Sequence, residues 1–498
     1  MTRTPRRRIA ALVAAAAALA LPAAAQAQAP PPTVTDPNLE VTTVATGLAQ
    51  PTGLAFIGPN DMLVNQKANG QVRRILNGEL LADPVLDLAV NSQSERGLLG
   101  IATHPNFFVN GWVYLFWTES TTGADTNVNG NVALLGNRVD RFVWDGSTLT
   151  FDRPITRFRA AQPAVAAAPP LPAQGAAGNH NGGVVRFGPD GKLYVVVGDT
   201  GRRGWMQNLR CGPFGLETIY TCPPDTPVPD DAFGGPQPDD AHFTGVIVRL
   251  NDDGTTPADN PFFGAGAAIG GEVGANIQRI YAYGVRNSYG LNFDPISGDL
   301  WQSENGDDTF SELNRVEPGM NSGWPQIMGP LDRLAEYKAI ETTPPFVGLQ
   351  QNRWPPANIA DTPEEALGRL VTFPGSHFSD PEFSWKFEVA PAGLGFVSGR
   401  ALGPQYNGDL FSGGARNFLE GGHIFRFDLT GNRRKVGVDD PRIEDRVADN
   451  LAKFEITESE SLLFGTDFGL TTDILQGPDG ALYVLSNTRS ALYKISRR

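Results

Sequence analysis

The sequence predicts an all-β fold, a six-bladed β-propeller with long inserted loops. Three observations support this fold class: a strand–turn–strand pattern recurs six times, helical periodicity is almost absent, and the chain contains 57 glycines and 40 prolines. Many short strands joined by tight turns are typical of such a composition, because proline fixes φ and glycine accepts positive φ. Six copies of one unit indicate a radial array with one unit per blade. A β-sandwich or a β-helix is the alternative.

The repeat consists of an apolar strand, a turn that contains Pro with Asn, Asp or Gly, and an apolar or aromatic strand. Residues 185–194 and 474–483 show it most clearly, because Pro-Asp-Gly stands between alternating apolar residues and favours a hairpin. The copies are unevenly spaced, so the long intervals contain inserted loops. Only residues 362–370 have a weakly helical pattern. The six turns contain Pro59, Pro105, Pro189, Pro295, Pro404 and Pro478.

The N-terminus has the pattern of an export signal. Arginines 6–8 precede an apolar run over residues 9–21 that is too short to span a bilayer, and residues 25–27 (Ala-Gln-Ala) offer a cleavage site. Either the general secretory route or a twin-arginine route fits, and both imply a secreted or periplasmic protein. No later apolar stretch is long enough to cross a membrane. The predicted organisation is a signal peptide over residues 1–27, a flexible mature N-terminus over residues 28–40, and a single six-bladed propeller domain over residues 41–498.

Charge and cysteine content restrict the partners. The chain has 40 basic and 54 acidic residues, and four of the basic ones are arginines in the predicted signal peptide. The mature chain therefore has 36 basic residues and a formal charge of −18. This balance argues against nucleic acid or anionic lipid as a partner, since both need a basic surface. Cys211 and Cys222 are the only cysteines. In an oxidising compartment we expect them to form a disulfide, and two cysteines alone cannot build a structural zinc site.

Three segments contain candidate functional residues. His180 lies in a polar, glycine-flanked loop (residues 178–183) before the third repeat, where it can serve as a general base or simply cap a strand. Residues 304–312 contain clustered carboxylates around a glycine turn, which suit a hard cation or form a solvated acidic turn. Arg286, before the fourth repeat, can clamp a carboxylate or form a salt bridge within its loop. All three segments enter equivalent ends of repeat strands, so a propeller brings them towards one mouth.

Five ordered motifs make the sequence more specific. They are residues 95–105, residues 179–183, residues 284–290, residues 302–306 together with Glu312, and residues 321–325. With these motifs the chain resembles the glucose/sorbosone dehydrogenase family, soluble six-bladed quinoproteins that use pyrroloquinoline quinone (PQQ) with calcium. The resemblance extends from about Leu48 to Ile495.

The resemblance implies roles for the cofactor and proton-transfer residues. His180 falls where the family has its base, which takes the proton from the anomeric hydroxyl of the sugar while hydride passes to the quinone. Arg286, Asn287 and Asn305 fall in segments that hold the cofactor in those enzymes.

The resemblance also implies two calcium sites. Gly306 and Asp307 fall where backbone carbonyls bind the calcium that contacts the quinone, polarising and orienting it as a Lewis acid. Glu312 and the backbone around Ser322 fall where a second, structural calcium is bound.

The chain departs from the family pattern at several positions. Glu95 and Asn179 occupy positions that face substrate or cofactor, where Gln and Asp are common, so they leave the substrate preference open. Residues 465–474 lack the arginine pair that clamps the cofactor in the family. Charge-assisted bonds are worth roughly 1.5–3 kcal/mol each, so this loss weakens binding by about 3–6 kcal/mol. Arg416, near the position of a cofactor-facing lysine, is the candidate that compensates.

The sequence thus predicts an exported oxidoreductase that oxidises aldose or related carbohydrate hydroxyls with PQQ and calcium. Its partners would be a small-molecule carbohydrate and an electron acceptor of unidentified type. One alternative is a calcium-dependent, lactonase-type hydrolase that uses His180 while calcium polarises a carbonyl. Another is a non-enzymatic propeller that binds sugars or glycans. The missing arginines favour the hydrolase and the binding propeller. The dehydrogenase is favoured by the combination of His180, the 286–287 pair and residues 304–312.

Overall fold

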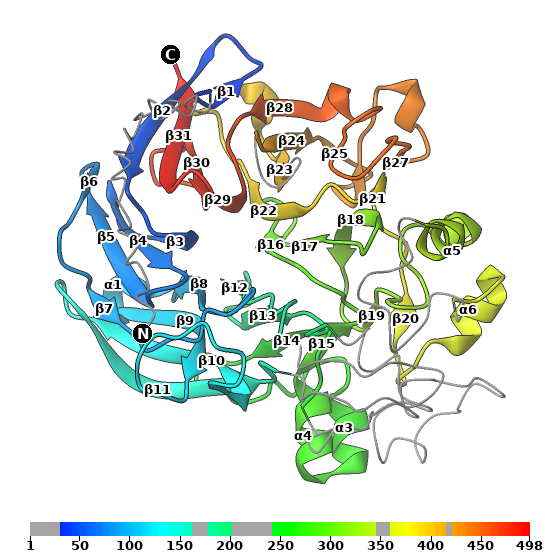
Figure 1. Ribbon diagram of the computed structural model, residues 1–498, viewed down its shortest axis with the longest axis horizontal. Helices are drawn as coiled ribbons and strands as arrows, with labels where there is room; N and C mark the ends of the chain where they lie inside the picture. The colour runs from blue at the N-terminus through cyan, green and yellow to red at the C-terminus, as the bar shows by residue number, and fades with distance from the viewer. Residues whose placement is uncertain (1–29, 162–177, 202–241, 345–358, 415–420) are drawn as a thin grey trace, which may run out of the picture.

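The described strands of the computed structural model form six sheets of four to six strands and one two-stranded ribbon. The larger sheets are arranged around a common centre (Figure 1). The predicted all-β propeller class is therefore confirmed. The predicted signal peptide, Cys211, Cys222 and Arg416 lie outside the described residues. The structure describes residues 30–161, 178–201, 242–344, 359–414 and 421–498.

Each large sheet contains an antiparallel meander that starts at an inner strand near the centre. The first sheet contains β3 (Pro51–Gly58), β4 (Asp61–Gln66), β5 (Gln71–Leu76), β6 (Glu79–Leu80) and β7 (Leu86–Asp87). The second contains β8 (Leu98–Thr103), β9 (Trp112–Ser120), β10 (Val132–Trp144) and β11 (Leu149–Phe158). The third contains β12 (Val185–Phe187), β13 (Leu193–Val197), β14 (Val246–Leu250), β15 (Ile280–Tyr283), β19 (Met320–Asn321) and β20 (His377–Phe378).

The other three large sheets follow the same plan. The fourth contains β16 (Gly290–Phe293), β17 (Leu300–Glu304), β18 (Thr309–Val316), β21 (Phe383–Phe387) and β27 (Val447–Ala448). The fifth contains β22 (Pro391–Phe396), β23 (Leu410–Gly414), β24 (His423–Phe427), β28 (Leu463–Thr466) and β1 (Thr33–Val34). The sixth contains β29 (Thr471–Gln476), β30 (Leu482–Ser486), β31 (Ala491–Arg497) and β2 (Leu39–Thr46), and the ribbon pairs β25 (Leu429–Thr430) with β26 (Lys435–Val436).

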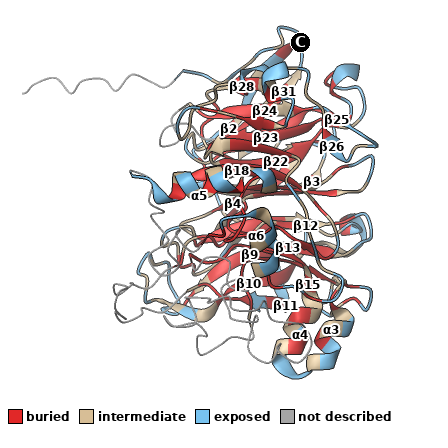
Figure 2. Cartoon of the chain, turned by 90° about the vertical axis from the view of Figure 1, so that its right-hand side faces the viewer, coloured by how far each residue is buried: buried red, intermediate tan, exposed pale blue. Residues whose placement is uncertain are grey.

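The inner strands form a closed ring, in which β3, β8, β12, β16, β22 and β29 contact one another in that order and β29 contacts β3 again (Figure 1). Each predicted proline turn joins an inner strand to the second strand of its sheet; Pro59, for example, lies between β3 and β4. Neighbouring sheets bury apolar side chains between them, as Leu63 and Leu115 do between the first and second sheets. Figure 2 shows that the strands are largely buried, whereas many connecting loops are exposed.

The two ends of the chain close the ring. In the sixth sheet β2 pairs antiparallel with β31, so that Val41 lies opposite Ile495. Upstream, β1 pairs with β28 of the fifth sheet. Four residues of the stretch expected to be flexible therefore lie in paired strands: Thr33, Val34, Leu39 and Glu40.

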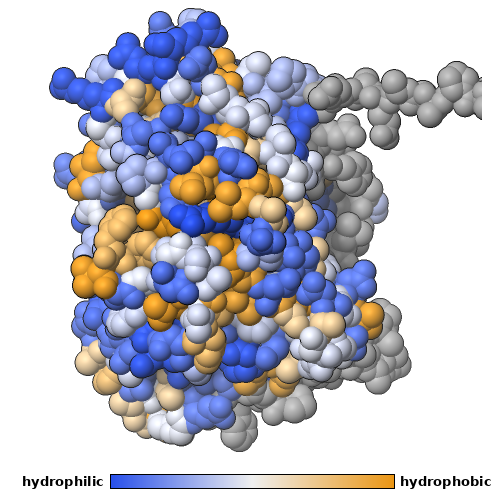
Figure 3. Space-filling model, turned by 90° about the vertical axis from the view of Figure 1, so that its left-hand side faces the viewer, coloured by the Kyte–Doolittle hydropathy of each residue, from blue (hydrophilic) through white to orange (hydrophobic). Residues whose placement is uncertain are grey.

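Helices occur in the loops. The predicted helix over residues 362–370 is confirmed as α6, where the Thr362 side chain accepts a hydrogen bond from the Glu365 backbone N–H at 3.2 Å. No helix of the described part is long and apolar enough to cross a membrane. Hydrophilic and hydrophobic residues are interspersed over the face seen in Figure 3. The α-helices are α1 (Phe107–Asn110), α3 (Phe263–Ile269), α4 (Gly271–Arg279), α5 (Leu334–Thr342) and α6 (Pro363–Arg369).

Candidate active site

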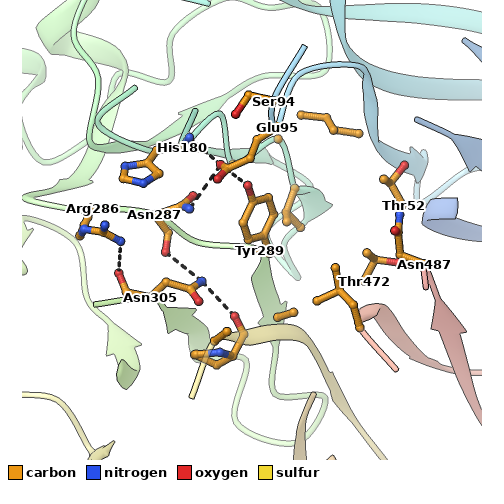
Figure 4. A pocket seen from close by; sticks show the side chains of 18 of the residues that line it. Thr52, Ser94, Glu95, His180, Arg286, Asn287, Tyr289, Asn305, Thr472 and Asn487 are labelled. Atoms are coloured by element: carbon orange, nitrogen blue, oxygen red, sulfur yellow. Dashed lines mark hydrogen bonds between the residues drawn. The ribbon is translucent and has the colours of Figure 1, made fainter. Parts of the chain in front are cut away.

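The predicted segments meet at one end of the propeller. In an antiparallel meander, the start of the first strand and the end of the second lie at the same edge. His180 precedes β12, Arg286 precedes β16, and Asp307 follows β17, so all three lie at that edge. They line a cavity of about 520 Å³ (Figure 4). Other predicted site residues that line it are Glu95, Asn287 and Asn305.

His180 is paired with a carboxylate that the sequence reasoning missed. Its Nδ1 lies 2.6 Å from Asp199 Oδ1, and both side chains are buried. A carboxylate only accepts, so Nδ1 carries a proton, and in the neutral imidazole Nε2 is the nitrogen with the lone pair. The second oxygen, Asp199 Oδ2, accepts from Trp324 Nε1 at 2.8 Å. The imidazole is thereby fixed in the tautomer that a general base needs.

Backbone geometry explains the glycines around this pair. His180 itself has φ of 56°, and Gly182 follows with φ of 60°. A Cβ at Gly198 would lie 2.5 Å from the His180 carbonyl oxygen and 2.6 Å from that of Arg286. Only glycine fits such an approach, so the loop that carries the histidine can pack directly against the end of β13.

Glu95 connects the histidine loop to the next segment of the mouth. Its Oε2 accepts from the His180 backbone N–H at 2.5 Å, from Asn287 Nδ2 at 3.4 Å, and from the Tyr289 hydroxyl (Figure 4). Asn287 Oδ1 is buried without a hydrogen-bond partner among the described residues, which leaves an acceptor for a bound polar ligand. Asn179 is half-buried and is not part of the cavity lining.

Arg286 forms an ion pair, as expected from its interpretation as a salt-bridged arginine. Its Nη2 donates to Asp307 Oδ1 at 2.9 Å, and its Nη1 donates to the Asn305 carbonyl at 3.0 Å. The guanidinium also lies 5.3 Å from the ring centroid of Trp324. Burial alone would lower the pKa of Arg286, but the nearby carboxylates, Asp307 first, raise it above its usual value. This side chain therefore stays charged while it lines the cavity.

The carboxylates of residues 304–312 are buried, so the interpretation as a solvated acidic turn is wrong. Glu304 lies opposite Glu312 in the β17–β18 register. Their hydrogen-bond partners include Ser322 Oγ, 3.4 Å from Glu304 Oε2, and Asn314 Nδ2, 2.9 Å from Glu312 Oε2. Burial raises the pKa of Glu312 to about 7, and burial together with the Glu312 charge raises that of Glu304 well above its usual value. Most of the groups that contact these two carboxylates are N–H donors, among them the Arg286 and Gly329 backbone N–H groups, and the calcium site that the resemblance implies at Glu312 stays a prediction.

A second buried acidic group adjoins the cavity. Carboxyl oxygens of Asp307, Asp308 and Glu341 lie within 4.8 Å of one another. Burial, together with the charge of Asp307, raises the pKa of Glu341 to about 8. Gly306 is required here, because a Cβ at this position would lie 2.0 Å from the Thr309 carbonyl oxygen.

Several site residues were not found from the sequence. Asp199 follows the buried strand β13 after a single glycine, and a polar residue at that position was the one available signal. Tyr289 lies inside a recognised motif. Glu341 lies on α5 and Lys453 in a loop far along the chain, and no local pattern marks either of them.

The wall at the missing arginine pair is uncharged. Leu470 and Thr472 line the cavity within the stretch where the family pattern has its arginines. Among the described residues, the basic side chains that line the cavity are Lys67, Arg286 and Lys453.

Residues 48–344 match the protein family described as "Glucose / Sorbosone dehydrogenase", which is more than half of the chain. The chain belongs to this family. Within it, the chain is 25% identical over 463 residues to the aldose sugar dehydrogenase YliI of Escherichia coli, covering 92% of this chain and 93% of that protein. It is 27% identical over 300 residues to the quinoprotein glucose dehydrogenase B of Acinetobacter calcoaceticus, covering 59% of this chain and 53% of that protein.

Solved structures of similar fold include the apo form of the soluble aldose sugar dehydrogenase of E. coli, with a TM-score of 0.59 and 23% identity over 92% of this chain and all of that chain. The PQQ-bound aldose sugar dehydrogenase of Streptomyces coelicolor matches with a TM-score of 0.53 and 22% identity over 92% of this chain and 98% of that chain. At these identities the likeness concerns the fold. Family membership identifies the chain as related to soluble quinoprotein sugar dehydrogenases, which are oxidoreductases.

Proposed function

We propose that this protein is an exported, six-bladed oxidoreductase that oxidises aldose or related carbohydrate hydroxyls with PQQ and calcium, in the periplasm or outside the cell. The observation that carries the proposal is the buried His180–Asp199 pair at the wall of a cavity of about 520 Å³. Each large sheet is assigned as one blade. The relatives named as sugar dehydrogenases support the substrate class, and the N-terminal pattern supports export.

The cavity residues fit a polar, anionic cofactor. Asn287 Oδ1 is a buried acceptor without a partner in the described part of the chain, and Arg286 supplies a positive charge close by. PQQ, when bound, would accept the hydride. The protein's own contribution is to hold His180 Nε2 ready to take the hydroxyl proton, because Asp199 retains the proton on Nδ1.

The test is a titration of the mature protein with PQQ and calcium, followed by the absorbance of bound cofactor, and then addition of aldoses. Tight binding and sugar-driven bleaching support the proposal. His180→Ala should abolish oxidation and leave PQQ affinity within a few-fold. Absence of binding at micromolar PQQ with calcium, or normal turnover in His180→Ala, contradicts it.

The uncharged wall at Leu470 and Thr472 favours a second candidate, because it removes two charge-assisted contacts to an anionic cofactor. A calcium-dependent lactonase would use the same histidine as a base towards water. Lactone hydrolysis that disappears with chelator, in protein that binds no PQQ, would support it. Sugar binding without turnover, at saturating calcium and PQQ, would indicate a non-enzymatic binding protein.

A further inference from the structure

Lys453 contacts one of the two backbone oxygens where the resemblance expects a calcium ion. Its Nζ donates to the Asp307 carbonyl at 2.9 Å, to Asp308 Oδ1 at 3.0 Å, and to Glu388 Oε2 at 2.9 Å. An ammonium has three protons, so these three contacts use all of them. The Asp307 carbonyl is one of the two backbone oxygens that the resemblance assigns to the cofactor-contacting calcium.

The surrounding oxygens suit a divalent ion as well as an ammonium. Carboxyl oxygens of Asp307, Asp308 and Glu341 lie within 4.8 Å of one another. Asp308 Oδ2 is buried and has no hydrogen-bond partner within the described ranges, so this carboxylate retains a ligand position. Hard oxygen ligands of this type bind calcium. A metal ion here would bind the Asp307 carbonyl oxygen that Lys453 contacts, and it would share the Asp308 carboxylate, of which Lys453 contacts Oδ1 and leaves Oδ2 open.

We propose that Lys453 is a tethered cation that competes with a divalent metal ion for the Asp307 and Asp308 oxygens at the cavity wall. In metal-free protein the ammonium neutralises these carboxylates and keeps the segment folded. A metal ion binds after the lysine side chain swings away, which its flexible stem and 22% side-chain exposure permit. The apparent metal affinity of the cavity is thereby lowered. This inference rests on the calcium part of the proposed function and does not depend on turnover.

Calorimetric titration with calcium chloride tests the competition in mature full-length protein after chelator treatment, with no PQQ present. Lys453→Met should bind calcium at the cavity at least about tenfold more tightly than wild type, because the competing charge is gone. Lys453→Arg retains the charge and should stay within about threefold of wild type. Lys67→Met is the matched control: its Nζ contacts the Ser92 and Ser94 carbonyls at 3.1 and 2.7 Å, and its loss should leave calcium affinity unchanged.

Calcium binding by the facing pair Glu304 and Glu312 provides an internal reference that Lys453→Met should not alter. Lys453→Gln repeats the test if the methionine variant does not fold. The proposed competition is wrong if calcium affinity is unchanged or lower in Lys453→Met and Lys453→Gln. If the variants bind calcium tightly but wild type and variants do not bind PQQ, the competition stands and the proposed redox function fails. If PQQ binds but neither Lys453 variant gains calcium affinity, the proposed competition fails and the proposed redox function stands.

Discussion

Asp199 holds His180 by one carboxylate oxygen and Trp324 by the other, at 2.6 and 2.8 Å. Its backbone N–H in turn donates to the Arg286 carbonyl at 2.8 Å. The orientation of the base is therefore linked to the neighbouring segment that carries Arg286, which also lines the cavity. The carboxylate accepts three hydrogen bonds, from His180, from Trp324 and, at 2.8 Å, from the Gly201 backbone N–H, so it acts as a positioning group for His180.

Asp199→Asn should lower kcat by roughly 10²-fold or more, the scale of a general-base contribution, because an amide can donate to Nδ1 and stabilise the wrong tautomer. PQQ affinity should stay within about threefold. The measurement is kcat together with cofactor titration. Trp324→Phe, which keeps an aromatic ring but removes the Nε1–H donor and part of the buried indole, should have a much smaller effect on kcat. Equal losses in both variants would mean that packing, and not the tautomer, is responsible.

Glu95→Gln should change KM for the sugar more than kcat. The glutamine oxygen can still accept from the His180 N–H, which the glutamate does at 2.5 Å, so the loop keeps its position. The same oxygen also keeps the contacts from Asn287 and the Tyr289 hydroxyl, whereas the NH₂ group replaces the other carboxylate oxygen and adds a donor at the cavity wall. Glu95→Ala should lower kcat as well, since it removes the acceptor of the His180 N–H. Steady-state kinetics over a panel of aldoses would measure this, and identical profiles for Gln and Ala would contradict it.

An ion pair between two inner strands contributes to stability. Arg186 Nη2 lies 2.5 Å from Asp473 Oδ1, and Asp473 Oδ2 accepts from the Leu54 N–H at 3.0 Å. Arg186→Met leaves a buried carboxylate without its cation, which should cost about 3–5 kcal/mol and lower Tm. The double variant Arg186→Met/Asp473→Asn should regain most of this, because Asn still accepts from the Leu54 N–H. Thermal denaturation should give a higher Tm for the double variant than for Arg186→Met. A double variant that is as unstable as the single one would contradict the prediction.

The facing pair Glu304 and Glu312 should make stability depend on pH. Both carboxyls have pKa values raised by burial, that of Glu312 to about 7, so the folded state retains protons that the unfolded chain releases above about pH 4.5. In chelator, stability should therefore fall as pH rises from about 5 to 7, on the order of 1.4 kcal/mol per pH unit for one such group. Calcium should restore Tm at pH 8 and have little effect at pH 5.

Glu312→Gln provides the control for this titration, because it removes one of the two acidic groups. The pH slope in chelator should be smaller in this variant, and the stabilisation by calcium at pH 8 should be reduced. A Tm that rises between pH 5 and 7 in wild type would contradict the assignment of a protonated pair.

The propeller class was predictable because its evidence is local. A Pro-Asp-Gly turn between alternating apolar residues specifies a hairpin wherever it occurs, and Pro189 and Pro478 both join the first two strands of a sheet. The α3–α4 pair was not predicted. Its segments are short and rich in glycine, and α4 is held by packing, for example through Ile277 in the core. Tertiary contacts, which a sequence pattern does not display, decide such elements.

The site was predictable where glycine-flanked motifs present polar residues, as at His180 and Arg286. Asp199 and Lys453 escaped because their partners lie 19 and about 145 residues away in sequence, and the fold alone brings them together. The burial of Glu304 and Glu312 also depends on packing, because the local sequence of an acidic turn is the same whether water or protein surrounds it. The disulfide between Cys211 and Cys222 and the role of Arg416 stay predictions.

The pairing of β2 with β31 has a consequence for biosynthesis. The strand β2 finds its partner only when β31 has left the ribosome, so until then the sixth sheet presents an open edge. Closure of the ring must therefore wait until β31 has been synthesised. A circular permutant with the natural ends joined and new ends in the turn between β10 and β11 should remove this delay, because the joined strands would then emerge as a simple hairpin.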